Sequence, residues 1–175
     1  MLKVTSADGT TIAYDRYGSG APVIVIGGAL CDRTTTQPLA EELAKDFTVV
    51  SYDRRGRGDS GDTTSYSVAR EVEDLGALIT ALGGVAAVYG HSSGAGLLAV
   101  AAASGLPITK AVLHEPPYGP DDEESQRESD ESGATVTGLL ALNRRAEAVE
   151  QFLAMAGMPA DTAAAMSRDP GIIAD

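Results

Sequence analysis

The sequence alternates between strand-like and helix-like segments over residues 22–115, and this alternation limits the fold more than any other feature. Four short segments are apolar, as strands buried on both faces are: 22–26, 47–53, 85–89 and 108–115. Three intervening segments have helical character: 38–46, 68–82 and 94–104. Strands that alternate with helices form right-handed crossovers, so we expect a mainly parallel sheet covered by helices on both faces.

The N-terminal residues predict an antiparallel pair of strands beside this arrangement. Segment 2–17 has the pattern of two strands joined at Asp8-Gly9, and this dipeptide readily adopts the positive φ values of a tight hairpin turn. The predicted fold class is therefore α/β, with a mainly parallel sheet and an antiparallel N-terminal hairpin.

The composition narrows the functional classes and the cellular setting. The chain has 175 residues, of which 43% are hydrophobic, enough for one compact domain, or a large piece of one, with a substantial core. Its formal net charge of −12 repels nucleic acids and anionic membrane surfaces, and no apolar run approaches the ~20 residues that cross a bilayer. The single cysteine, Cys31, and an N-terminus without a signal-peptide pattern favour a reducing cytoplasm. We expect no nucleic-acid partner and no membrane association.

The chain is predicted to contain three parts. Residues 1–118 carry the strand and helix alternation, and residues 119–133 form an acidic linker that contains nothing to bury. We expect its core, 121–132, to be a solvated loop or a disordered segment. Apolar residues recur at helical spacing in the remainder, 134–175, without a new strand. Because insertions after a strand commonly cover the ligand crevice of such sheets, this part is predicted to be a helical lid or cap.

The residues between the strand 85–89 and the helix 94–104 suggest a nucleophile. They read G-H-S-S-G over 90–94 and match the motif G-x-S-x-G in the strand-to-helix context that this motif demands. The glycines let strand and helix approach closely, so the turn projects the hydroxyl of Ser92 above the sheet. The amide of Ser93 then lies at the positive end of the helix dipole, where an acyl oxyanion would form.

Two further stretches join this motif in a resemblance to α/β-hydrolases. Gly-Gly-Ala-Leu follows the first parallel strand at 27–30, and DRRGRGDS follows the next strand at 53–60. In motif and order, residues 1–118 resemble the N-terminal two-thirds of this family, although many relatives have His-Gly where this chain has Gly-Gly. The resemblance implies that Ser92 is the nucleophile, that the amides of Ala29 and Ser93 form the oxyanion hole, and that no metal or organic cofactor is needed.

The arginines of 53–60 allow two interpretations. Arg54, Arg55 and Arg57 could bind a carboxylate or a phosphate. The favoured interpretation is structural, with glycines that permit a tight bend and charges that pair locally.

The base that Ser92 requires is the main open question. A serine hydroxyl is a weak nucleophile unless a base accepts its proton, and only His91 and His114 are available. The side chain of His91 should diverge from Ser92, and His114 is expected to pack beneath the lid, with a role as base as the alternative. Glu115 ends the last strand, where some family members carry the triad acid, so it is a candidate acid or else a strand cap.

The resemblance also implies two more strands, carrying an acid and a histidine, that this chain lacks. We therefore expect the histidine to come from outside the chain, and this chain alone to be inactive. The strand 108–115 should then leave an open sheet edge, and we expect the lid helices, a complementary C-terminal polypeptide or a second copy in a homodimer to cover it.

Three functional hypotheses follow. The first is a serine hydrolase of small esters, lactones or related acyl substrates, which forms an acyl-enzyme on Ser92. The second is a noncatalytic module of the same fold that binds a small molecule. The third is an interaction fragment whose open sheet edge recruits another chain.

Overall fold

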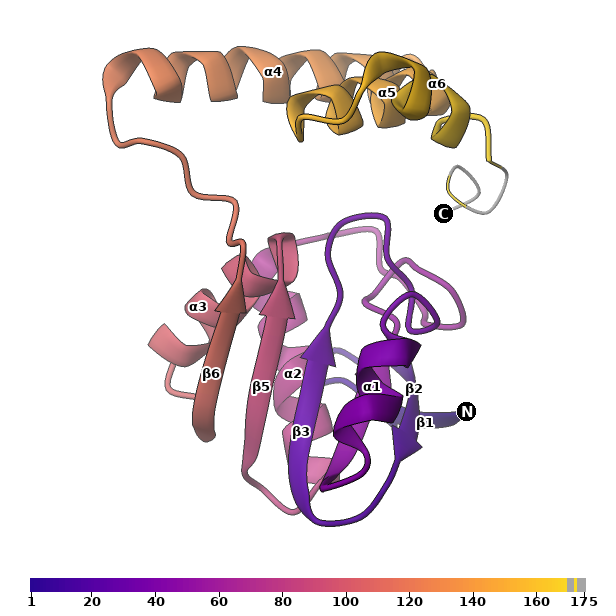
Figure 1. Ribbon diagram of the computed structural model, residues 1–175, viewed down its shortest axis with the longest axis vertical. Helices are drawn as coiled ribbons and strands as arrows, with labels where there is room; N and C mark the ends of the chain where they lie inside the picture. The colour runs from indigo at the N-terminus through magenta and orange to yellow at the C-terminus, as the bar shows by residue number, and fades with distance from the viewer. Residues whose placement is uncertain (170–171, 173–175) are drawn as a thin grey trace. The chain divides into compact units, whose positions relative to one another are not determined.

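The structure is a computed structural model that describes residues 1–169 and 172. The chain forms two compact units, Met1–Pro117 and Tyr118–Asp175 (Figure 1). The first unit contains the sheet and the second contains helices.

The first unit is built on a six-stranded sheet with the order β1-β2-β4-β3-β5-β6. The strands have these bounds: β1 Leu2–Thr5, β2 Thr11–Tyr17, β3 Ala21–Ile26, β4 Phe47–Tyr52, β5 Ala86–His91 and β6 Ile108–His114. Strand β3 pairs in parallel with β4 and β5, and β5 pairs in parallel with β6. Strand β2 is antiparallel to both of its neighbours, β1 and β4. The predicted fold class is therefore confirmed.

The predicted N-terminal hairpin forms at the expected turn. Gly9 has a φ of 90°, and the side chain of Asp8 accepts a hydrogen bond from the amide of Thr10 at 3.0 Å. This turn sets the register in which Thr5 faces Thr11.

Three helices cover the sheet and enclose its core. Their bounds are α1 Gln37–Leu43, α2 Val68–Ala81 and α3 Ser93–Ala103. Helix α1 packs on one face, where Ala40 meets Val23, Val25 and Val49. Helices α2 and α3 pack on the other face, in a larger cluster that includes Leu75, Ile79 and Leu98 from the helices and Ile24, Ile26 and Val88 from the strands. The two-sided burial of β3 and β4 explains their continuous apolar sequences.

Strand β6 differs from the strands at the centre of the sheet. Six of its seven residues are exposed, including Val112 at 53% and Leu113 at 43%. Within the described residues, β5 is its only strand partner. This part of the chain thus leaves the outer edge of β6 open, as expected from the sequence.

The second unit consists of α4 Glu123–Ala141, α5 Arg145–Met155 and α6 Ala160–Met166. The prediction of a loop or disordered segment at 121–132 was wrong, because α4 begins inside it. Asp122 caps the helix by accepting a hydrogen bond from the amide of Ser125, and the acidic residues of the first turn interact favourably with the helix dipole. No residue of α4 is buried, as its acidic composition indicates.

Residues 170–171 and 173–175 of the predicted lid lie outside the described residues. Among the helices that the structure describes, none has the length and apolar character needed to cross a bilayer.

Candidate functional site

Ser92 occupies a sharp corner between β5 and α3. Its φ of 53° and ψ of −120° are unusual for a residue with a side chain, and the surrounding backbone holds them in place. The amide of Ser92 donates to the carbonyl oxygen of His114 at 2.9 Å. The carbonyl oxygen of Ser92 accepts from the amides of Ala95 and Gly96 at 2.9 and 3.2 Å. The strand on one side and the helix on the other therefore fix this serine.

The two glycines of the motif are required by the close approach of backbone segments. A Cβ atom on Gly90 would lie 2.4 Å from the carbonyl oxygen of Gly94. A Cβ atom on Gly94 would lie 2.6 Å from the carbonyl oxygens of Ile26 and Gly27. Neither side chain could be accommodated without moving the backbone, so these glycines set the distance between α3 and the sheet.

The loop that follows β3 runs directly beside Ser92. A Cβ atom on Gly28 would lie 3.3 Å from the Cβ of Ser92 and 3.3 Å from Nδ1 of His91. Two residues later, Leu30 has a φ of 58°. The amides of Ala29 and Ser93 have no acceptor among residues 1–169 and 172. The predicted oxyanion loop and the predicted nucleophile are therefore neighbours.

A buried ion pair supports the start of α3. Arg54 donates from Nε and Nη2 to the carboxylate of Glu71 at 2.6 and 2.7 Å, and from Nη1 to Oγ of Ser93 at 2.9 Å. The hydroxyl of Tyr66 donates to the same carboxylate at 2.7 Å. Burial alone would raise the pKa of Glu71, but the hydrogen bonds and charge of Arg54 outweigh it and lower this pKa below its ordinary value.

Arg55 and Arg33 belong to separate structural networks. Arg55 pairs with Asp74 at 2.7 Å and with Asp8 at 2.9 Å, and its hydrogen bond lowers the pKa of Asp8. Arg33 pairs with Asp53, Asp15 and Asp59. Arg54 and Arg55 therefore pair across elements, where the sequence suggested local pairing.

The sequence of α2 contains a signal for the acidic partners of Arg54 and Arg55. Glu71 and Asp74 are only 3% and 1% exposed, on the helix that also buries Leu75 and Ile79. Two acids next to the apolar stripe of a helix indicate that buried cations lie opposite them.

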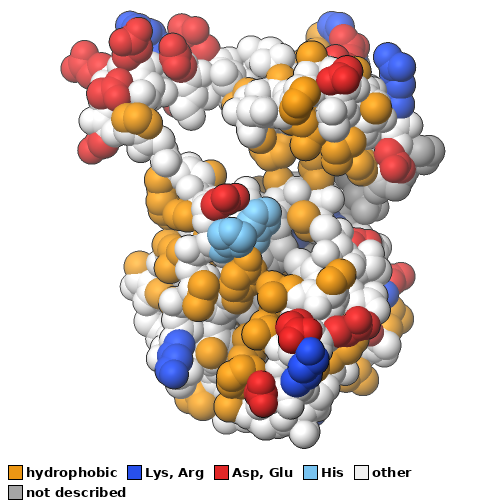
Figure 2. All heavy atoms as spheres, viewed as in Figure 1, with side chains coloured by type: hydrophobic (Ala, Val, Ile, Leu, Met, Phe, Trp, Pro, Cys, Tyr) orange, Lys and Arg blue, Asp and Glu red, His pale blue; other side chains and the backbone are white. Residues whose placement is uncertain are grey.

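The two histidines gather with Glu115 on the other side of Ser92. Their ring centres lie 5.1 Å apart, and Nε2 of His91 lies 3.9 Å from a carboxylate oxygen of Glu115. Nδ1 of His114 is hydrogen-bonded to the hydroxyl of Tyr89. Figure 2 shows the two histidine side chains together, with an acidic side chain beside them and hydrophobic side chains below.

This histidine cluster is open to solvent. The side chains of His91 and Glu115 are 41% and 77% exposed, and Glu115 has a φ of 48°. Among the described residues, neither imidazole is hydrogen-bonded to Oγ of Ser92. The structure thus places Glu115 next to the side chain of His91. The carbonyl oxygen of the preceding residue, His114, accepts the hydrogen bond from the amide of Ser92.

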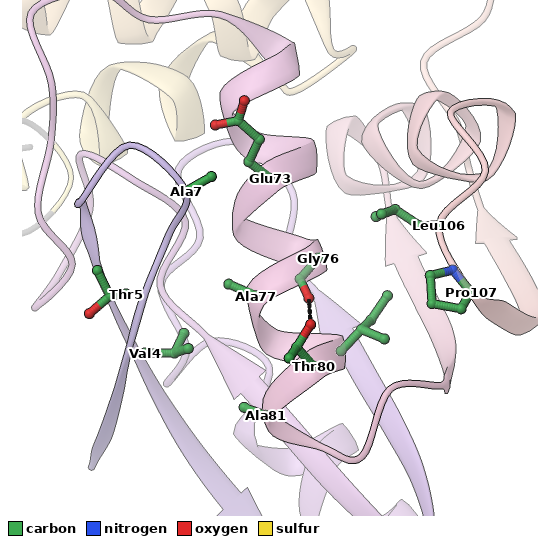
Figure 3. Close-up of a pocket in the computed structure, with 11 residues that line it drawn as sticks. Val4, Thr5, Ala7, Glu73, Gly76, Ala77, Thr80, Ala81, Leu106 and Pro107 are labelled. Carbon is green, nitrogen blue, oxygen red and sulfur yellow. Dashed lines mark hydrogen bonds between the residues drawn. The ribbon is translucent and has the colours of Figure 1, made fainter.

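A separate apolar groove lies at the opposite end of the sheet. It has a volume of about 590 Å³ and lies between the N-terminal hairpin, α2 and the residues before β6 (Figure 3). Val4, Ala77 and Leu106 are among its lining residues. Pro107, which precedes β6, also lines it, whereas Ser92 follows the end of the parallel strand β5. The groove is therefore not part of the Ser92 site.

No arrangement of acids, histidines and cysteine in the described part of the chain groups three or more ligands for a metal ion.

Comparison with known proteins identifies relatives of the whole arrangement. A family model described as "Alpha/beta hydrolase family" matches residues 19–174. A solved alpha/beta hydrolase from Sphaerobacter thermophilus is 50% identical, with a TM-score of 0.85, and the match covers 98% of this chain and 66% of that one. A solved esterase from a Rhodococcus species is 28% identical, with a TM-score of 0.58, over 63% of this chain and 43% of that one.

A curated relative carries a different activity in its name. A non-heme haloperoxidase from Rhodococcus erythropolis is 33% identical over 118 residues, which are 65% of this chain and 43% of the relative. The chain spans less than half the length of the curated relatives it matches.

Proposed function

The chain belongs to the alpha/beta hydrolase family, and on that premise we propose that it carries the nucleophile and the oxyanion hole of a serine hydrolase. One observation carries the proposal: Ser92 stands at a strained corner, with the Gly28–Ala29 backbone beside it and two amides free of acceptors among the described residues. The proposed substrates are small esters, lactones or related acyl compounds.

The proposed reaction proceeds through an acyl-enzyme. Oγ of Ser92 forms a bond to the substrate carbonyl carbon, its proton passes to a base, and the carbonyl oxygen becomes an oxyanion. The amides of Ala29 and Ser93 stabilise that charge, aided by the N-terminus of α3. The alkoxide leaving group departs with a proton, and water then hydrolyses the ester on Ser92. No metal or organic cofactor takes part in this scheme.

The base in this proposal is a histidine from outside the chain. His114 already bonds Tyr89 through Nδ1, and His91 lies beside Glu115, so neither is engaged with the hydroxyl of Ser92. Glu115 is the candidate acid that orients the incoming imidazole, because it follows β6 at the edge of the sheet where Ser92 lies.

A complementary polypeptide or a second copy of the chain is the proposed partner that covers β6. The exposure of Val112 and Leu113 supports this, because apolar residues of a sheet are normally covered. The single cysteine favours a cytoplasmic location. Light scattering that reports a monomer of 17.9 kDa without a companion chain would contradict the proposed partner.

The test is covalent labelling with a fluorophosphonate of the chain assembled with the polypeptide that supplies the histidine, followed by intact mass and peptide mapping. We expect one adduct on Ser92 of the wild-type protein and none in Ser92→Ala. Ser93→Ala is the matched control. It keeps the backbone amide of residue 93 and the hydroxyl of Ser92, so it should still be labelled. An adduct elsewhere, or no adduct, contradicts the proposal. Small-molecule binding that persists in Ser92→Ala without turnover would instead favour a noncatalytic binding module.

A further inference from the structure

Arg57 differs from the other arginines around the site. Arg33, Arg54 and Arg55 each pair with at least one carboxylate at 2.9 Å or less. Arg57 forms no ion pair with any residue that the structure describes, although burial and the nearby charge of Arg54 lower the pKa of its guanidinium. Its hydrogen bond is to a backbone carbonyl: Nη1 donates to the oxygen of Gly28 at 3.0 Å. The charge of Glu71 acts on Arg57 only from a distance, without a direct ion pair. A partly buried cation without a directly bonded carboxylate is costly, so a specific role for it is expected.

The acceptor belongs to the peptide group that also carries the amide of Ala29. A peptide group is planar and trans, so its C=O and N–H point in opposite directions. When Arg57 holds the oxygen of Gly28, the N–H of Ala29 must point to the other side of the loop. That N–H has no acceptor among the described residues.

The loop needs an external anchor because its own backbone is permissive. Gly27 and Gly28 lack side chains, and glycine populates both signs of φ, so the peptide after Gly28 can rotate at little cost. The rotated form would direct the carbonyl oxygen, and not the amide, toward the neighbouring Ser92, and this oxygen would repel an oxyanion. A hydrogen bond from a cation to that carbonyl also makes the N–H of the same peptide a stronger donor.

We infer that Arg57 is a positioning residue, which locks the Gly28–Ala29 peptide with its N–H toward the oxyanion of the Ser92 reaction. The inference rests on the proposed function. Arg57 itself touches neither substrate nor Ser92 in this role. Removal of one oxyanion donor typically lowers kcat by about 10²–10³-fold, and misdirection of this amide should cost up to that amount.

The kinetic test compares Arg57→Met and Arg57→Lys in the protein assembled with the polypeptide that supplies the catalytic histidine, with the exposed Arg16→Met on β2 as the matched control. The phosphonylation rate constant of Ser92 and the hydrolysis of p-nitrophenyl acetate and mono-p-nitrophenyl succinate are measured. We expect Arg57→Met to lose about 10–10³-fold in both rates, equally for the neutral and the carboxylate-bearing ester, with KM nearly unchanged. Arg57→Lys should recover part of the loss, and Arg16→Met should match the wild type.

Two kinetic results would overturn the inference. One is a wild-type rate in Arg57→Met. The other is a loss confined to the KM of the succinate ester, which would mean that Arg57 binds the substrate carboxylate directly.

A second readout does not depend on activity. In ¹H–¹⁵N spectra, the amide peak of Ala29 should shift or split in Arg57→Met, whereas that of the exposed Lys110 should not. An unchanged Ala29 peak would refute the anchoring of the peptide. If the wild type is not labelled at Ser92, the proposed function fails, and the Ala29 peak still reports whether Arg57 holds the peptide.

Discussion

The two sides of Ser92 are built very differently. On the side of β4 and α2, Arg54 and Glu71 are 6% and 3% exposed, and Arg54 contacts the start of α3 by donating a hydrogen bond to Oγ of Ser93. On the side of β6, the carboxylate of Glu115 is 77% exposed and lies 3.9 Å from Nε2 of His91. One side is a closed network of short, charged hydrogen bonds, and the other is an open cluster at a sheet edge.

This difference separates the two requirements of serine catalysis. Stabilisation of an oxyanion needs rigid, preorganised amides, and the closed side supports those of Ala29 and Ser93. Proton transfer needs an imidazole at the hydroxyl of the serine, and none of the described residues supplies one. Under the proposal, the electrostatic part of the site lies within this chain, whereas its base comes from another group.

Removal of Glu71 should have the largest effect on stability. Glu71→Ala leaves the buried guanidinium of Arg54 without its carboxylate, and loss of one partner of a buried pair costs about 3–5 kcal/mol. The matched change on the open side, Glu115→Ala, should alter the free energy of unfolding by less than about 0.5 kcal/mol. Urea denaturation measures both, and similar losses in the two variants would erase the distinction between the sides.

Two glycines of α3 provide the next comparison. Gly94→Ala places a methyl group 2.6 Å from two carbonyl oxygens of the β3 loop region, so it should destabilise the fold by about 1–3 kcal/mol. Gly96→Ala meets Pro117 at 3.7 Å, an ordinary contact on the side of β6. It should be neutral or stabilise the helix by up to about 1 kcal/mol. Equal effects of Gly94→Ala and Gly96→Ala on the midpoint of thermal unfolding would show that α3 packs equally closely against the β3 region and against Pro117.

The smallest expected effect is on the pH dependence of stability. Because the folded pKa of Glu71 is lowered, its contribution is present above its ordinary pKa of 4.5 and is lost as the pH falls through the folded value. Glu71→Gln should therefore flatten the loss of stability below pH 4.5, by at most about 1.4 kcal/mol per pH unit. Urea denaturation of both proteins at several pH values, from about 3 to about 6, gives the slope of the free energy of unfolding against pH. Parallel curves for the two proteins would mean that Glu71 does not titrate with folding.

Local patterns in the sequence predicted most of the fold, and the structure explains why the rest escaped. The alternation of segments and the Asp8-Gly9 turn are short-range signals, and every strand and helix of the first unit appears within a few residues of its prediction. The N-terminal part of α4, within the acidic segment 121–132, was missed because acidic composition outweighed the cap at Asp122 and the favourable acids of the first turn. Composition indicates exposure, but it does not exclude a helix.

The site was predictable to the extent that its chemistry lies in contiguous residues. The motif at 90–94 and the loop at 27–30 could be paired because their strands, β5 and β3, were expected in the same parallel sheet. The contacts of Arg54 with Glu71 and of Arg57 with Gly28 join residues 17 and 29 positions apart, and no local pattern specifies them. Tertiary packing, which a single sequence does not display, selects those partners.

The central claim, that the amides of Ala29 and Ser93 receive the charge formed on a substrate attacked by Ser92, is tested most directly by a crystal structure of the phosphonylated protein. We predict a phosphonyl oxygen within about 2.7–3.1 Å of both backbone nitrogens, with the phosphorus bonded to Oγ of Ser92. An adduct whose oxygen points into solvent, or is held by other donors while either amide stays unengaged, would contradict the account.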